Sequence, residues 1–383
     1  MALLPAMTAW AEVGDEFTKN NLKYKVTSEN PNTVELTGYD GEKPTGALDI
    51  PAIVKNGGMD YEVTSIGNSA FGATSLTSVK IPSGVTTISQ WAFEYCTNLK
   101  SVIFAERSQL TILNKGAFDT CSSLMSINIP EGVTSIGDYA FNNCRSLTSI
   151  NIPSSVTSIG RLAFASCSNL ISVTFAEGSQ LTNIGQSAFR YCSNLTSISI
   201  PEGVKSINDH AFSDCSSLTS FTIPKYVTSI DKAAFARCSN LASITIPESV
   251  TYIGEWAFLD CSCLASITIP KGVRWINNYA FDGCKSMEDI YCYADPTVLT
   301  WSGADNSFKN NKETICHVAD VDAWTEKFAN VNVTFVGDLS TDINALSPAI
   351  IEGKRAVYNL AGQRMDGMRR GLNIINGEKV WVK

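Results

Sequence analysis

The segment IPEGVTSIGDYAFNNCRSL, Ile129–Leu147, is one copy of a phrase that recurs through most of this chain. Each of its ten copies contains an Ala-Phe pair. A unit of this length cannot bury its own apolar face, so successive units must stack and share one elongated core. The repeat therefore predicts a solenoid, whose ligands are expected on a surface rather than in a deep pocket. The repeated phenylalanines, 22 to 25 residues apart, are Phe71, Phe93, Phe118, Phe141, Phe164, Phe189, Phe212, Phe235, Phe258 and Phe281.

Each unit contains one expected helix and one expected strand. The position four residues before the phenylalanine is always Gly, Ser, Asn or Asp, which are residue types that favour turns and helix N-caps. A helix of one to two turns is therefore expected around the phenylalanine, as in Asp138–Cys144. The pattern L-x-S-[VIF]-x-[IF] follows, and its alternation predicts a strand with Ile150 inward and Asn151 outward. Stacked at about 4.8 Å per turn, these strands would form a parallel sheet on the order of 50 Å long.

A cysteine lies three residues after the phenylalanine in nine of the ten units. On a short helix this position faces the core, so these cysteines are interpreted as small buried hydrophobic residues. The chain has no CxxC or clustered histidines, and neither a metal site nor another cofactor is expected. Cys292 and Cys316 lie outside this column, and their pairing in a disulfide is an open alternative if the chain is exported.

The organisation of the chain follows from where the repeat begins and ends. Residues 1–11 are short, apolar and end in Ala-Trp-Ala, and are interpreted as a signal-peptide remnant. Residues 12–58 are expected to form a strand-rich N-terminal cap, 59–290 the solenoid, 291–338 a C-terminal cap rich in aromatic residues, and 339–349 a polar linker. In residues 350–383, Asn376-Gly377 between apolar segments predicts a small β-hairpin module.

The consensus L-x-x-I-x-I-P-x-x-V-x-x-I-G-x-x-A-F-x-x-C resembles the BspA-like leucine-rich repeats of surface proteins from host-associated anaerobic bacteria, from Met59 to about Ile290. The opening GDEF…LKYKVTSENPNTVELTGYDG and the ending VYNLAGQR…GLNIINGEKVWVK resemble terminal segments of such proteins. The resemblance implies an α/β leucine-rich-repeat solenoid of about ten 23-residue turns, with a parallel sheet, short helices and a cap at each end. It also implies export and, in some members, adhesion to host matrix proteins or other cells. It carries over no catalytic residues.

Charge and composition exclude several function classes. The net charge is −8, whereas nucleic-acid binding needs a basic surface. No apolar run approaches the roughly 18 residues of a membrane span. The chain has two histidines, His210 and His317, and no acid pair stands out for general acid–base chemistry. We therefore expect no enzymatic activity and no catalytic residues.

Two candidate ligand surfaces remain. The first is the outward column of the predicted sheet, where small polar side chains are positioned to hydrogen-bond a protein strand or a glycan. The alternative is that Ser and Thr are simply favourable exposed strand residues. The candidate residues of this sheet face are Asn151, Thr174, Ser199, Thr222, Thr245 and Thr268.

The second candidate surface is aromatic. Tyr252 and Trp256 in one unit align with Trp275 and Tyr279 in the next, so the four rings are expected to form one outward patch. The alternative is that the C-terminal cap covers this patch. A smaller pair, Trp91 and Tyr95, is predicted far from that cap.

The sequence thus favours a non-enzymatic, adhesin-like binding protein that is secreted or exposed on the cell surface. Its expected partner is a host matrix or cell-surface protein. The alternative is a carbohydrate-binding accessory protein that uses the aromatic patches.

Overall fold

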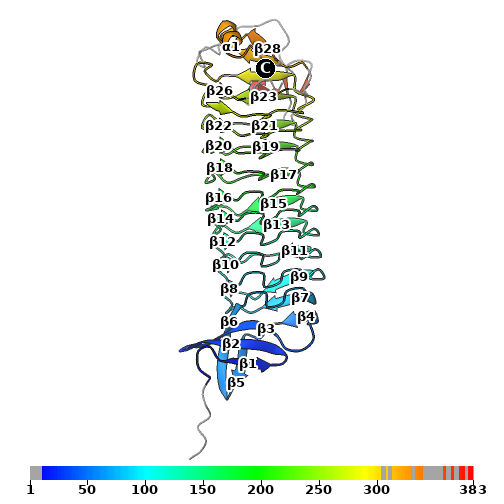
Figure 1. Cartoon of the computed structure of the whole chain (residues 1–383), viewed down its shortest axis with the longest axis vertical. Coiled ribbons are helices and arrows are strands. Elements are labelled where there is room, and N and C mark those ends of the chain that lie inside the picture. Colours follow the sequence, from blue (N-terminus) through cyan, green and yellow to red (C-terminus); the bar gives the residue numbers. More distant parts are fainter. Residues whose placement is uncertain are drawn as a thin grey trace, which may run out of the picture.

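The computed structural model describes residues 11–302, 308, 313–329 and 333–339, together with the backbone of four short strands between 357 and 382. The predicted signal-peptide remnant and the predicted linker lie outside the described residues, apart from Ala11 and Leu339. The described chain forms an elongated stack of coils, which confirms the predicted solenoid (Figure 1). Two lines of strands run along the stack on different sides of it.

The first line contains the strands predicted from L-x-S-[VIF]-x-[IF]. They pair in parallel register, for example Ile150 with Val173, but hydrogen bonding divides the line into several shorter sheets rather than one. The line consists of β4 (Thr45–Asp49), β7 (Ser75–Ile81), β9 (Ser101–Phe104), β11 (Ser126–Ile127), β13 (Ser149–Ile152), β15 (Ser172–Phe175), β17 (Ser197–Ile198), β19 (Ser220–Thr222), β21 (Ser243–Thr245), β23 (Ser266–Ile269), β25 (Asp289–Cys292), β27 (Ile315–Val318) and β28 (Thr334–Gly337).

The second line was not predicted as strand. It begins with a longer strand and continues with two-residue strands that also pair in parallel, such as Ser229 with Tyr252 and Tyr252 with Trp275. Each short strand from β8 to β24 contains the inward Ile or Leu that lies five residues before the phenylalanine, and β26 has Trp301 opposite Ile276 instead. The line consists of β6 (Met59–Ile66), β8 (Thr87–Ile88), β10 (Ile112–Leu113), β12 (Ser135–Ile136), β14 (Ser158–Ile159), β16 (Asn183–Ile184), β18 (Ser206–Ile207), β20 (Ser229–Ile230), β22 (Tyr252–Ile253), β24 (Trp275–Ile276) and β26 (Thr300–Trp301).

The short helices predicted around each phenylalanine are wrong, because these segments are successive turns. Residues two before and two after the phenylalanine adopt positive φ, as at Trp91 (60°) and Tyr95 (55°). This alternation directs every second N–H across to the next coil: Phe93 N donates to Ala117 O at 2.9 Å. A helix would direct these donors along the chain, so this segment would form no hydrogen bonds to the next coil. The one α-helix among the described residues is α1 (Val321–Lys327), near the C-terminal end.

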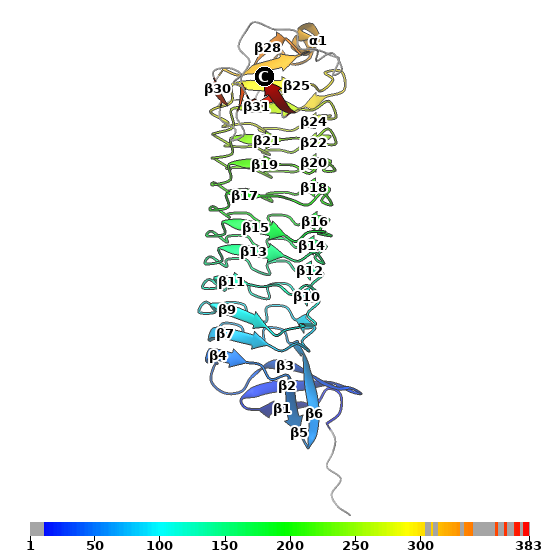
Figure 2. The ribbon, with the colours of Figure 1, turned by 180° about the vertical axis from the view of Figure 1, so that it is seen from behind.

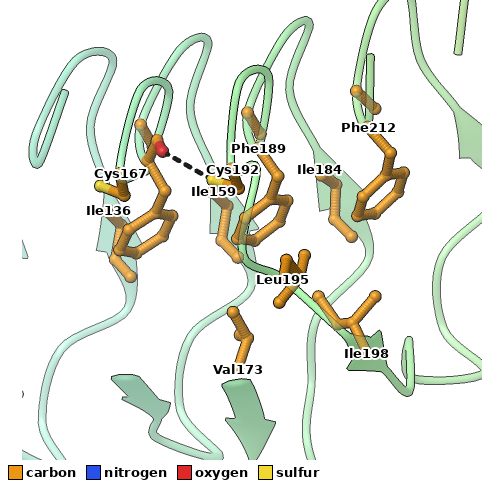
Figure 3. Packing of buried hydrophobic residues seen from close by; sticks show 14 of the residues in the cluster. Ile136, Ile159, Cys167, Val173, Ile184, Phe189, Cys192, Leu195, Ile198 and Phe212 are labelled. Carbon is orange, nitrogen blue, oxygen red and sulfur yellow. Dashed lines mark hydrogen bonds between the residues drawn. The ribbon is translucent and has the colours of Figure 1, made fainter. Parts of the chain in front are cut away.

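The phenylalanines form a continuous stack through the core. Successive rings from Phe71 to Phe281 lie 5.3 to 5.6 Å apart between centroids and nearly parallel, and none is exposed (Figure 3). Phe308 extends the stack beyond Phe281 at 5.7 Å. This eleventh coil was not predicted, because 27 residues rather than 22 to 25 separate the two phenylalanines.

The nine cysteines of the repeat are buried, as expected, and each also donates a hydrogen bond. The Sγ of Cys192, for example, donates to the carbonyl oxygen of Phe164 in the preceding coil at 3.2 Å (Figure 3). The same contact recurs in every coil that carries the cysteine, at 3.1 to 3.3 Å. Cys292 and Cys316 are free and buried, and Cys316 lies opposite Ile290 rather than Cys292.

Different elements pack at the two ends of the stack of coils (Figure 2). Near the N-terminus, β3 (Asn32–Tyr39) pairs in parallel with β6, β4 pairs with β7, and the Tyr39 ring stacks on Phe71. The remaining strands there are β1 (Glu16–Lys19), β2 (Leu22–Glu29) and β5 (Ile53–Asn56). At the other end, Trp324 of α1 is buried against Phe328 and Phe335. A separate sheet contains β29 (Val357–Tyr358), β30 (Arg364–Met365), β31 (Gly371–Ile375) and β32 (Glu378–Val382), with β31 and β32 antiparallel.

Candidate functional site

The sheet face carries the first set of predicted residues, and the structure places all six on the exposed side of the first strand line. Asn151 lies opposite Thr174, and Thr222 lies opposite Thr245. The hydroxyl of Thr174 donates to Asn151 Oδ1 at 3.0 Å, so this part of the column is a connected polar row. Small side chains at regular intervals give the face a flat surface. The exposed residues are Asn151, Thr174, Ser199, Thr222, Thr245 and Thr268.

Exposed apolar side chains accompany this row in the N-terminal half of the solenoid. Ile103 lies in the outward column itself, and Met125 and Ile171 directly follow the inward leucine of their units. About half of each side chain is exposed (53%, 52% and 50%). The exposed Met125 and Ile171 could have been recognised from the sequence, because most other units have Thr, Ala or a charged residue after this leucine.

The first aromatic cluster differs from its prediction. Trp91 does not join Tyr95; its ring lies over Gly116 and contacts Tyr139, with 6.1 Å between ring centroids. A Cβ atom at Gly116 would lie 1.8 Å from the Trp91 ring, so only glycine leaves room for this contact. Lys115 Nζ lies 5.5 Å from the Trp91 ring and 5.8 Å from the Tyr139 ring. This self-packed group of Trp91, Lys115, Gly116 and Tyr139 is the Trp91 cluster, and sequence reasoning missed its Tyr139.

The second aromatic cluster brings together the predicted pairs. Tyr252 and Trp275 are neighbours in the second strand line, and the rings of Trp256 and Tyr279 lie 6.5 Å apart. Trp275 remains 47% exposed, so the described part of the C-terminal region leaves this ring accessible. These four residues are the Trp275 cluster.

Lys232 approaches the Trp275 cluster from the preceding coil. Its Nζ lies 4.4 Å from the centre of the Trp256 ring and 2.8 Å from Glu255 Oε2. The ammonium group is thus held by a carboxylate and an aromatic face, each of which stabilises a cation.

A shallow polar hollow of about 340 Å³ lies on the coils that precede the Trp275 cluster. Sequence reasoning did not predict it, because the residues four before the phenylalanine were interpreted only as turn or cap residues and the hollow forms between three coils. Asp209 Oδ1 accepts a hydrogen bond from Lys232 N at 3.0 Å. Burial raises the pKa of the Asp231 carboxyl, a hydrogen bond from Ser229 opposes the rise, and Asp209 adds to it. The hollow is lined by Asn183, Gly185, Gln186, Asn208, Asp209 and Asp231.

The two histidines lie apart from each other. His317 lies between two carboxylates, with Nδ1 2.7 Å from Asp338 and Nε2 3.1 Å from Asp289, and its ring stacks on Tyr291. These contacts join three neighbouring strands near the end of the solenoid. His210 is half-buried beside the hollow, and its pKa is lowered by burial and by the nearby Arg190.

Neither histidine belongs to a candidate metal centre. Across the described ranges, no group of three or more His, Cys, Asp or Glu residues is arranged to hold a metal ion. Within the same ranges, no helix has both the length and the apolar character needed to cross a membrane.

The repeat array matches a known sequence family. The profile of the BspA type Leucine rich repeat region matches residues 64–195 and 182–314, with six copies. The comparison with curated protein sequences returned no significant match.

The comparison with solved structures found similar bacterial proteins. The pneumococcal vaccine antigen PcpA is 19% identical, with a TM-score of 0.54, over 86% of this chain and 100% of its own. A leucine-rich repeat protein from Bacteroides ovatus is 26% identical, with a TM-score of 0.43, over 84% of this chain and 99% of its own. A leucine rich cell surface protein from Faecalibacterium prausnitzii is 27% identical, with a TM-score of 0.46, over 86% of this chain and 98% of its own.

Proposed function

The chain belongs to the BspA-type leucine-rich-repeat family, and on that premise we propose that it is a non-enzymatic, adhesin-like binding protein. Its site of action is the cell surface or the extracellular medium, as the family resemblance and the Ala9-Trp10-Ala11 segment suggest. Its ligand is a protein of the host matrix or of another cell surface. The surface that contacts this ligand is the sheet face.

One observation carries this proposal: the outward residues of the sheet face form an exposed row on a rigid, repetitive scaffold. Neighbouring residues along the row are separated by the strand spacing, about 4.8 Å. A partner strand or loop lying across the row would meet hydroxyl and amide groups at this interval. Ile103, Met125 and Ile171 add apolar area at one end, and protein interfaces combine such area with polar contacts.

The test is binding of the purified full chain to immobilised fibronectin, fibrinogen, laminin and collagen, measured by biolayer interferometry. Replacing Thr222 and Thr245 with Arg introduces two bulky charges in the middle of the sheet face. The column already contains Lys80, so a long basic side chain fits this position without disturbing the core. We expect at least a tenfold loss of affinity for whichever protein binds, because contacts across the row are blocked.

A matched control uses the same two coils. Thr228 is exposed and Thr251 is half-buried, each directly before a strand of the second line, in a column that already contains Lys205 and Arg274. Replacing both threonines with Arg adds the same charge away from the sheet face. Equal losses from the two double variants, or no loss from either, would contradict binding by the sheet face.

A further inference from the structure

The polar hollow and the neighbouring Tyr252 and Trp275 lie along the second strand line, and together they are called the strip. Figure 1 shows this strand line on a different side of the stack from the first. The column that begins with Asn183 at the hollow continues through Ser206 and Ser229 to Tyr252 and Trp275. Tyr252 lies opposite Ser229, two residues before Asp231 of the hollow. Burial raises the pKa of Tyr252, and the carboxylates of Asp231 and Asp209 raise it further. The strip thus passes from polar groups to aromatic rings.

The chemistry of the hollow suits a ligand with many hydroxyl groups. A carboxylate has two acceptor oxygens, and an amide both donates and accepts, so adjacent hydroxyls on a sugar ring find complementary partners. Asp209, Asp231, Asn183 and Gln186 supply these groups within one hollow of about 340 Å³. The amide of Asn208 is held by Ser206 and by the carbonyl oxygen of Ile184. That volume lies at the lower end of the ~300–1,000 Å³ typical of small-molecule sites.

The aromatic end of the strip supplies the apolar contact that polar groups lack. Sugar rings present C–H faces, which pack on exposed aromatic rings, and Trp275 is 47% exposed. The Trp91 cluster offers no equivalent, because its indole lies over Gly116 and beside Lys115. The rings of the Trp91 cluster already pack against other residues of the protein.

The charge of the strip selects against acidic ligands. Asp209, Asp231 and Glu255 are carboxyl groups, and they would repel a carboxylate or a sulfate group. Lys232, the basic side chain beside them, is paired with Glu255 and lies over Trp256. The strip therefore disfavours an anionic ligand and fits a neutral one.

We propose that the hollow and the rings of Tyr252 and Trp275 form a binding site for a neutral oligosaccharide, whose hydroxyls contact Asp209 and Asp231 while a neighbouring sugar ring packs on Trp275. The sugar chain runs along the solenoid axis, across successive coils. This site is separate from the sheet face, so the same molecule holds a glycan on one side and a protein on another.

The test measures binding of the full chain to cellohexaose, maltoheptaose and xyloglucan as neutral probes, by isothermal titration calorimetry and affinity electrophoresis. Polygalacturonate and chondroitin sulfate serve as acidic probes. The Trp275→Ala variant removes the exposed ring on which the sugar is proposed to pack. The Asp231→Asn variant removes one carboxylate and preserves the fold, because Asn already occupies the same position in three other units, at 114, 208 and 277.

We expect at least one neutral probe to bind and both variants to weaken it about tenfold or more. The Tyr95→Ala variant removes a ring of similar exposure outside the strip and should leave binding unchanged. Retained binding in Trp275→Ala and Asp231→Asn, a preference for the acidic probes, or no binding to any neutral probe would each overturn the proposal.

The sheet-face variant separates this result from the proposed protein binding. Thr222→Arg/Thr245→Arg should leave glycan affinity unchanged, and Trp275→Ala should leave protein affinity unchanged. A glycan affinity that falls with the sheet-face variant would place the sugar on the wrong side of the solenoid and so overturn the inference.

Discussion

The Trp91 cluster and the Trp275 cluster occupy the same solenoid, start from similar sequence patterns and end in opposite states. In each, two aromatic residues four positions apart in a unit predict an exposed patch. In the first, Gly116 in the next coil allows Trp91 to lie flat and reach Tyr139 one coil further on. In the second, Trp256 occupies the position of Trp91 and packs against Tyr279 and Lys232. Trp275 lies six residues before its phenylalanine, pairs with Tyr252 and stays open to solvent.

On a solenoid surface, the side chains of the neighbouring coil therefore decide whether an aromatic residue packs within the protein or stays exposed to solvent. A side chain has two neighbours about 4.8 Å away, one on each adjacent coil. A glycine there provides a place for a ring to lie, whereas another large side chain keeps both rings upright or stacked. The residue that controls exposure is therefore 22 to 25 positions away in sequence.

The largest loss of stability should come from the phenylalanine stack, and it should be the same near the Trp91 cluster and near the Trp275 cluster. Phe118 and Phe258 are fully buried and each stacks between two other phenylalanines. We expect Phe118→Ala and Phe258→Ala each to cost about 3–5 kcal/mol in free energy of unfolding, because both leave a cavity in a continuous stack. Guanidinium unfolding followed by circular dichroism measures this. Costs that differ by several kcal/mol would show that the clusters differ in scaffold as well as in surface.

The next largest loss of stability is expected at Gly116, the glycine beneath the Trp91 ring. Gly116 has φ of +62°, and we expect Gly116→Ala to cost more than the ~1–2 kcal/mol of a left-handed residue, because the new Cβ also displaces the Trp91 ring. Gly178→Ala is the matched control, since Gly178 has φ of +73° and open space around it. In a Trp91→Ala background the excess cost of Gly116→Ala over Gly178→Ala should disappear. An excess that persists without Trp91 would contradict this explanation.

Replacing each tryptophan with alanine should then have different effects on stability in the two clusters. We expect Trp91→Ala to destabilise the protein by about 1–2 kcal/mol, because it loses an aromatic pair and a cation–π contact. Trp275→Ala should change stability by no more than about 0.5 kcal/mol, as is usual for exposed positions. Thermal and chemical unfolding of the two variants tests this order. The reverse order would mean that Trp275 is structural and would remove it as a ligand platform.

The smallest effect concerns charge beside the Trp91 cluster. Burial raises the pKa of Asp119, and burial together with Asp119 raises the pKa of Glu94. A carboxyl whose pKa is raised on folding destabilises the folded state when it is ionised, and the penalty fades as pH falls through the raised pKa. Asp119→Asn should thus slightly stabilise the protein at pH 7, still accepting the hydrogen bond from Asn142.

The measurement for Asp119→Asn is the difference in unfolding midpoint between variant and wild type across pH 3 to 7. The stabilisation should be largest at neutral pH and vanish below the usual carboxyl range. A difference that is constant with pH would contradict a charge-based cause.

Much of the fold was predictable because the buried columns repeat. The inward Phe, Ile, Val and Ala positions and the outward row from Asn151 to Thr268 were predicted from spacing and alternation alone, and the structure agrees with them. The short helices were predicted incorrectly, because the same Gly, Asn and Asp residues that cap helices also begin turns. The hydrogen bonds that connect turns to the next coil are tertiary, and no local pattern encodes them.

The spacing of residues is enough to predict a solenoid with a column of buried phenylalanines, a buried cysteine column and a polar sheet face. Those features repeat every 22 to 25 residues, so their periodicity reports burial directly. The packing of Trp91 over Gly116, the exposure of Trp275, and the hollow that Asp209 and Asp231 share are visible only in three dimensions. The physical reason is that these contacts join adjacent coils, where shape and charge act across space between residues that are distant in the chain.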